Sequence, residues 1–137
     1  MKKQRMYLVL IVLLIGLSSS GCLTLSTSQY DDFQKTFFGT WHYPKNNIFY
    51  TISGETLVAY MPGDNTGFTA RISKWEYVEN SQSDRGEYPK GYTITAKMEK
   101  MTGGWWIEVG DTDTWTWYMH NDKKSIVTAS GTVYFKR

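Results

Sequence analysis

Few side chains in this sequence are of types that do chemistry, and their spacing does not suit catalysis. The two histidines, His42 and His120, lie far apart, and a metal site would need at least one more convergent ligand. Asp111 and Asp113 are spaced like two ligands of a calcium loop, but the other ligand positions are missing, and a hairpin turn explains both. No nucleophile elbow, phosphate-binding glycine loop or Cys/His pair occurs. The sequence therefore predicts neither an enzyme nor a bound metal or cofactor.

Cys22 is the only cysteine, and it directly follows a hydrophobic leader. Lys2, Lys3 and Arg5 precede an apolar run over residues 6–17, and small residues follow up to the cysteine. These three zones are typical of an export signal. The run has 12 residues, whereas a transmembrane helix needs about 20. We therefore expect residues 1–21 to be a signal peptide, and an exported chain with one cysteine cannot form an internal disulfide.

The end of the leader resembles the lipobox of bacterial lipoproteins, in which small residues precede a cysteine that is acylated. Gly21 and Ser20 match this pattern, whereas Ser19 replaces the aliphatic residue that the family prefers. The resemblance implies lipidation of Cys22, and the alternative is an ordinary secretory signal that leaves a stray thiol. In enteric bacteria an Asp after the cysteine favours the inner membrane; here Leu23 follows. We expect a lipid-anchored protein of the cell envelope, at the outer membrane, whose partner through the lipid is the membrane itself.

The mature chain from Cys22 onward has 116 residues, which suffices for one domain. It carries twelve Lys and Arg against thirteen Asp and Glu, a net charge of −1. This charge argues against nucleic acid as a partner. The mature chain also holds 21 aromatic residues, and each large side chain that is buried contributes roughly 1.5 to 3 kcal/mol. We expect these aromatic residues to form the core.

The chain after the leader divides into a tether over residues 22–29 and a domain over residues 30–137. Residues 30–38 favour one or two helical turns, with Phe33, Phe37 and Phe38 on the apolar side. From there on, apolar residues alternate with polar ones, which is typical of strands. The pattern predicts strands at 40–52, 56–61, 68–77, 92–98, 105–109, 115–119, 125–129 and 132–137. We expect the inner face of the fourth strand to consist of Tyr92, Ile94, Ala96 and Met98, and that of the last strand to include Val133, Phe135 and Arg137. The third strand changes parity midway, which predicts a bulge near Ser73 and Lys74.

The predicted fold class is all-β, an eight-stranded antiparallel up-and-down barrel. Its strands are joined by mostly short turns, with no room for crossover helices, and closure would leave no free edges. An open sandwich is the alternative. The polar connection over residues 79–91 is the longest one, and it is interpreted either as a flap over a barrel end or as a solvated loop.

The stretch FFGTW, residues 37–41, resembles the Gly-x-Trp signature of the calycin superfamily, which comprises lipocalins, fatty-acid-binding proteins and avidins. In that superfamily the Trp closes one barrel end beneath an Arg from the last strand. The resemblance implies these roles for Trp41 and Arg137, with Lys136 as the alternative to the Arg. Avidins expect Asn and Ser where this chain has Tyr43 and Asn47. We therefore do not expect a biotin site.

Four tryptophans are the candidate ligand-binding residues: Trp75, Trp105, Trp115 and Trp117. The last three share inward parity, so they either wall a pocket for a flat or apolar ligand or simply fill the barrel. Trp106 points the other way and is the candidate for contact with a partner. The leading hypothesis is a membrane-anchored, lipocalin-like lipoprotein that binds a small apolar or aromatic ligand. The alternatives are a protein-binding module, such as a hydrolase inhibitor or surface adhesin, and a structural barrel without a ligand.

Overall fold

The computed structural model describes residues 29–82 and 86–137, and residues Asp32–Arg137 form one compact unit. The predicted signal peptide, Cys22 and nearly all of the predicted tether lie outside the described residues. No helix in the described ranges has both the length and the apolar character needed to cross a membrane.

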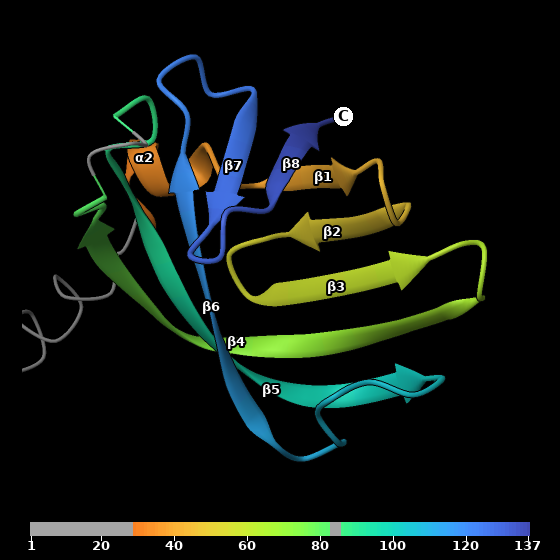
Figure 1. Ribbon diagram of the computed structural model, residues 1–137. Coiled ribbons are helices and arrows are strands. Elements are labelled where there is room, and N and C mark those ends of the chain that lie inside the picture. The colour runs from red at the N-terminus through yellow and green to blue at the C-terminus, as the bar shows by residue number, and fades with distance from the viewer. Residues whose placement is uncertain (1–28, 83–85) are drawn as a thin grey trace, which may run out of the picture. The chain divides into compact units, whose positions relative to one another are not determined.

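The unit is a closed antiparallel barrel in which every strand pairs with its neighbours along the chain, and the last strand pairs with the first (Figure 1). This confirms the predicted fold class, and the architecture is compatible with a calycin-like fold. A short helix, α2 (Asp32–Lys35), precedes the first strand. The strands are β1 (Gly39–Tyr43), β2 (Ile48–Ile52), β3 (Thr56–Met61), β4 (Thr66–Glu79), β5 (Lys90–Thr102), β6 (Thr112–Met119), β7 (Ser125–Thr128) and β8 (Val133–Lys136).

The strands differ from the prediction in two places. One predicted strand forms two strands and another predicted strand is absent, so the total is eight in both cases. Residues 40–52 form two strands, because Pro44 starts a four-residue turn that Asn47 ends with a positive φ of 50°. Residues 105–109 form no strand. Gly103 and Gly110 take φ values of 83° and 94° at the two ends of that segment, so the chain bends instead of pairing.

The predicted bulge in the third expected strand is confirmed in β4. Ile72 pairs with Ala96 and Lys74 with Thr95, so Ser73 is the additional residue. Across the same two strands, Thr69 pairs with Lys100 and Ala70 with Met98, so that a second irregularity occurs in β5. The bulge at Ser73 moves Trp75 to the same side of the sheet as Ile72, because one additional residue exchanges the two faces.

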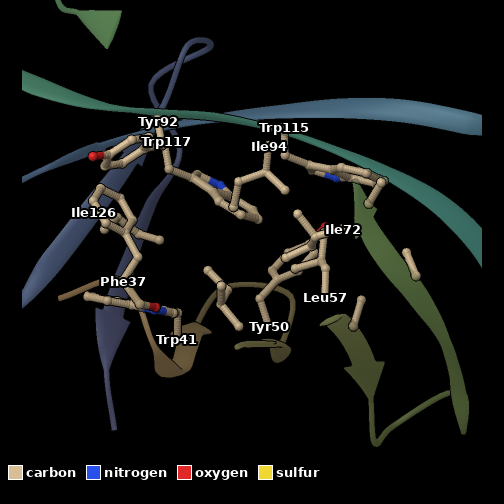
Figure 2. Close-up of a cluster of buried hydrophobic side chains, with 14 of the residues drawn as sticks. Phe37, Trp41, Tyr50, Leu57, Ile72, Tyr92, Ile94, Trp115, Trp117 and Ile126 are labelled. Atoms are coloured by element: carbon tan, nitrogen blue, oxygen red, sulfur yellow. The ribbon is translucent and has the colours of Figure 1, made fainter. Parts of the chain in front are cut away.

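Side chains of alternate residues fill the barrel, as the period of two predicted (Figure 2). The predicted inner face of β5 is confirmed, since Tyr92, Ile94, Ala96 and Met98 are all buried. In Figure 2 Ile94 lies between Trp117 and Trp115, and Phe37 lies beside Trp41. Up-and-down connectivity places α2 and the β2–β3, β4–β5 and β6–β7 connections at one end, called here the α2 end. The other four connections lie at the opposite end, called here the far end.

Candidate functional site

Trp41 closes the α2 end of the barrel. Its side chain is fully buried, and its Nε1 donates a hydrogen bond of 2.8 Å to the carbonyl oxygen of Phe37. The ammonium of Lys136 lies 5.0 Å from the centre of the indole ring, and it donates a hydrogen bond of 3.0 Å to the Thr36 carbonyl. β1 and β8 place the two residues together, because Trp41 and Lys136 are directly paired across the strands.

The assignment of the capping cation to Arg137 is therefore wrong, and Lys136 takes that position. The sequence analysis placed Val133, Phe135 and Arg137 on the inner face of the last strand. The structure shows the opposite parity, since Tyr134 is buried while Phe135 is 50% exposed. Arg137 is exposed, and its main-chain N–H donates to the Thr40 carbonyl.

Replacing Lys136 by Met should lower the free energy of unfolding by about 1 to 2 kcal/mol, because one cation–π contact and one hydrogen bond are lost. Urea denaturation followed by tryptophan fluorescence measures this change. Arg137→Met is the matched control, and we expect it to stay within about 0.5 kcal/mol of the wild type. Equal losses in the two variants would contradict the assignment of Lys136.

The structure brings three of the four candidate ligand-binding tryptophans into one aromatic cluster and leaves the fourth outside it. Phe68 contacts Trp105 at 5.0 Å and Trp115 at 5.8 Å between ring centres. Tyr50 contacts Trp117 at 5.5 Å and Phe68 at 6.3 Å, which completes the cluster.

Trp75 lies in a second aromatic group, with Phe38 at 5.9 Å and Tyr92 at 5.5 Å. Its Nε1 donates to the Gly54 carbonyl in the β2–β3 connection, which belongs to the α2 end. Trp105 also differs from expectation, because it reaches the first cluster from the loop after β5 and not from a strand. Inward parity alone could not show that Trp75 belongs to a different aromatic group from Trp105.

Tyr50 and Tyr134 add polar groups to the first cluster that the sequence analysis did not single out. Their rings lie 5.4 Å apart. Burial is the main cause that raises the pKa of Tyr50, and the neighbouring Tyr134 raises this pKa further. Burial likewise raises the pKa of Tyr134. Both phenols therefore stay protonated at neutral pH and can donate hydrogen bonds. Tyr50 was recognisable from its shared parity with Ile52, but the reversed parity of the last strand hid Tyr134.

An open hollow of about 320 Å³ lies beside this cluster, where β7 ends. The lining residues from β6 are Thr114, Trp115, Thr116 and Trp117. The others lie at the end of β7 and in the turn after it: Thr128, Ala129 and Ser130. β7 has four residues and pairs with only Trp117–Met119 of β6, so the first part of β6 forms one wall of the hollow. Trp115 and Trp117 thus border the hollow, although both residues are buried, with 9% and 2% of their surface exposed.

Trp106 is 66% exposed, which agrees with the exposure predicted for it. It lies in the loop between β5 and β6, and its Nε1 donates a 3.0 Å hydrogen bond to Asp113 Oδ2. Its role in binding a partner stays a prediction.

Polar residues gather at the α2 end around His120. Its Nε2 lies 3.0 Å from Glu87 and its Nδ1 lies 2.8 Å from Asp122. The hydrogen bond with Glu87 is the main cause that raises the pKa of His120. A second hollow of about 240 Å³ adjoins this cluster, with Lys90, His120 and Lys123 among its lining residues.

His42 belongs to a separate place on the barrel. Its ring stacks on Phe49 at 4.3 Å, and Nε2 lies 2.9 Å from Asn47 Oδ1. Within residues 29–82 and 86–137, no three His, Cys, Asp or Glu side chains come together as metal ligands. Asp111 and Asp113 instead accept hydrogen bonds from the main-chain N–H groups of Glu108 and Thr114.

The fold and the aromatic cluster thus define a small closed β-barrel with a hollow in its wall, an architecture compatible with a calycin-like fold. Comparison of the chain with protein-family models, with curated proteins and with solved structures gives no match. The function is therefore argued from the site alone.

Proposed function

We propose that the protein is a lipid-anchored, lipocalin-like lipoprotein of the bacterial cell envelope, and that its barrel binds a small apolar or aromatic ligand. The hollow lined by Trp115 and Trp117 is the observation that carries the ligand-binding proposal. The leader and Cys22 support the envelope location through the lipobox resemblance.

The interior of the barrel favours binding at the wall over binding at the centre. Trp117, Leu57, Ile94 and Met98 are among the largest fully buried side chains, so the middle of the barrel is filled. Trp115 is 9% exposed and lines the open hollow, where an apolar ligand would cover indole surface without displacing the core.

A fluorescence titration tests this proposal. Adding the apolar probe N-phenyl-1-naphthylamine should quench the tryptophan emission and raise the emission of the probe, because the probe would lie against Trp115 and Trp117. Trp115→Leu keeps an apolar side chain and should weaken binding by about tenfold or more, which corresponds to about 1.4 kcal/mol.

Trp106→Leu is the matched control for that titration, and it should leave probe binding unchanged because Trp106 does not line the hollow. Absence of any saturable probe signal, or equal loss in the two variants, would refute binding at the hollow.

Trp106 supports a second candidate function, the protein-binding module. An indole that is 66% exposed provides a large apolar surface, and Val109 of the same loop is 58% exposed. In this interpretation the far end of the barrel contacts a protein of the envelope. A pull-down from envelope extracts whose yield falls with Trp106→Ala would favour this function over ligand binding.

A further inference from the structure

The hollow of about 240 Å³ at the α2 end is lined by three segments from different parts of the chain. Phe33 belongs to α2, and Pro89 and Lys90 lie where the β4–β5 connection meets β5. His120 and Lys123 lie in the turn that follows β6. Figure 1 shows these segments at the same end of the barrel. The hollow shares no lining residue with the one where β7 ends, so it is a separate candidate site.

Contacts between the β4–β5 and β6–β7 connections hold the walls of this hollow in place. The main-chain N–H of Asn121 donates a hydrogen bond of 2.9 Å to the Glu87 carbonyl. The hydroxyl oxygens of Tyr88 and Ser125 lie 3.0 Å apart, and the Tyr88 ring packs edge-on against the His120 ring at 4.9 Å. The two connections are therefore joined before any ligand binds, which lowers the entropic cost of binding.

Two lysine side chains supply positive charge to the hollow. The Lys90 ammonium lies 4.6 Å from the centre of the Phe33 ring, and this cation–π contact holds the ammonium at the hollow while leaving N–H donors for a ligand. Lys123 lines the hollow from the β6–β7 turn. Within residues 29–82 and 86–137, neither lysine forms an ion pair with a carboxylate. Both ammonium groups can therefore donate hydrogen bonds to an anion.

The backbone of Lys123 has an unfavourable conformation. Its φ is 61°, which lies in the left-handed region that side chains with a Cβ rarely adopt. The other non-glycine residues with positive φ in the described part of the chain are Asn47 and Asn65, a residue type that tolerates this region. The Lys123 N–H donates to the His120 carbonyl at 2.9 Å, which closes the turn around it. A strained residue that its surroundings hold in place is typical of functional positions.

The carboxylates near the hollow are directed away from it. Glu87 and Asp122 lie 3.0 and 2.8 Å from the two ring nitrogens of His120, and neither residue lines the hollow. Asp32 lines the hollow, but its carboxylate is fully exposed and lies 3.9 Å from the Lys35 ammonium. No carboxylate inside the hollow therefore cancels the positive charge of the two lysines.

We propose that this hollow binds a small organic anion, whose acid group is bound by Lys90 and Lys123 and whose apolar body contacts Phe33 and Pro89. Phe33 is half-buried and Pro89 is exposed, so both offer apolar surface. The volume is several times that of a water molecule and smaller than the sites of drug-sized ligands, so a body of one or two rings fits. The site is additional to the proposed site for an apolar ligand and does not depend on it.

The test compares 1-naphthoate with 1-naphthamide, which has nearly the same shape but no charge. A titration of the intact, ¹⁵N-labelled protein followed by amide NMR shifts gives both dissociation constants. We expect a value of about 1 mM or lower for 1-naphthoate. Binding of 1-naphthamide should be about tenfold weaker, because the charge-assisted hydrogen bonds are lost. The largest shifts should occur at the amides of Lys90, Asn121 and Lys123, which line the hollow.

Three lysine variants locate the acid group. Lys90→Gln and Lys123→Gln should each weaken 1-naphthoate binding by about fivefold and leave 1-naphthamide binding within about twofold. Lys124→Gln removes the same charge from the next residue of the turn, whose side chain does not line the hollow. It is the matched control, and 1-naphthoate binding should stay within about twofold of the wild type.

Equal affinities for the two naphthalene compounds, or equal losses in Lys123→Gln and Lys124→Gln, would overturn the proposal. Binding of inorganic phosphate as tight as that of 1-naphthoate would also overturn it, because phosphate has no apolar body. If Trp115→Leu abolishes 1-naphthoate binding, the ligand lies in the hollow where β7 ends, which refutes this site and supports the proposed function. If a lysine variant fails to fold, the comparison of the two compounds on the wild type still decides.

Discussion

A Trp41→Ala variant should lose about 3 to 5 kcal/mol of unfolding free energy, the range that large buried aromatic residues show on truncation. This is most or all of the stability of a typical small domain. Trp41 is fully buried, and its Nε1 holds the Phe37 carbonyl, so truncation opens a cavity and removes a buried hydrogen bond at the same time. The loss should appear in urea denaturation as a large fall of the midpoint or as failure to fold at 25 °C.

Two controls identify the cause of that loss. Trp106→Ala removes the same volume from a side chain that is 66% exposed, and it should change stability by less than about 0.5 kcal/mol. Trp41→Phe keeps most of the buried apolar surface and removes the hydrogen bond, so its loss should be intermediate. If Trp41→Ala unfolds at the same urea concentration as the wild type, Trp41 does not close the barrel.

A Cys22→Ser variant should abolish anchoring completely. Without the thiol no acyl chain can be attached, so labelling with radioactive palmitate in a bacterial host should fall to background and the protein should leave the membrane fraction. The effect is large because each buried methylene contributes about 0.8 kcal/mol, and several acyl chains are lost together. The site lies outside the described residues, so this prediction depends on the sequence pattern alone.

Leu23→Asp is the informative control for Cys22→Ser. It keeps the acylated cysteine, and in an enteric host it should shift the protein from the outer to the inner membrane without releasing it. A Cys22→Ser protein that stays with the membranes would show that something other than a lipid on Cys22 holds it there.

Local patterns were sufficient to predict the barrel because its inner face obeys a strict period of two. Tyr92, Ile94, Ala96 and Met98 could be assigned without coordinates, and the change of parity between Ile72 and Trp75 located the bulge at Ser73. Alternation fails at turns, where local backbone preferences decide. Pro44 and Asn47 interrupt an otherwise regular run, and Gly103 and Gly110 redirect a segment whose alternation was as good as that of a strand.

The candidate site was harder to predict, because it depends on where strands end and not on what they contain. The parity of β6 correctly placed Trp115 and Trp117 inside. Nothing in the sequence indicated that β7 would pair with only three residues of β6, although that short pairing forms the hollow. The choice between Arg137 and Lys136 failed for a similar reason, since Val133, Tyr134 and Phe135 are all apolar and either parity looked acceptable.

The unequal strand lengths also bear on how the chain folds. β4 and β5 have 14 and 13 residues and follow each other directly in the chain, so their hairpin can form early in folding. The ring is completed when β8 meets β1, through two paired rows and the contact of Lys136 with Thr36, one hundred positions away. The pairing of β8 with β1 joins residues far apart in the chain, so its formation costs much conformational entropy, and few interactions offset that cost. Closure of the barrel by β8 and β1 should therefore be a late step of folding. An open, curved sheet with its aromatic interior uncovered should precede it.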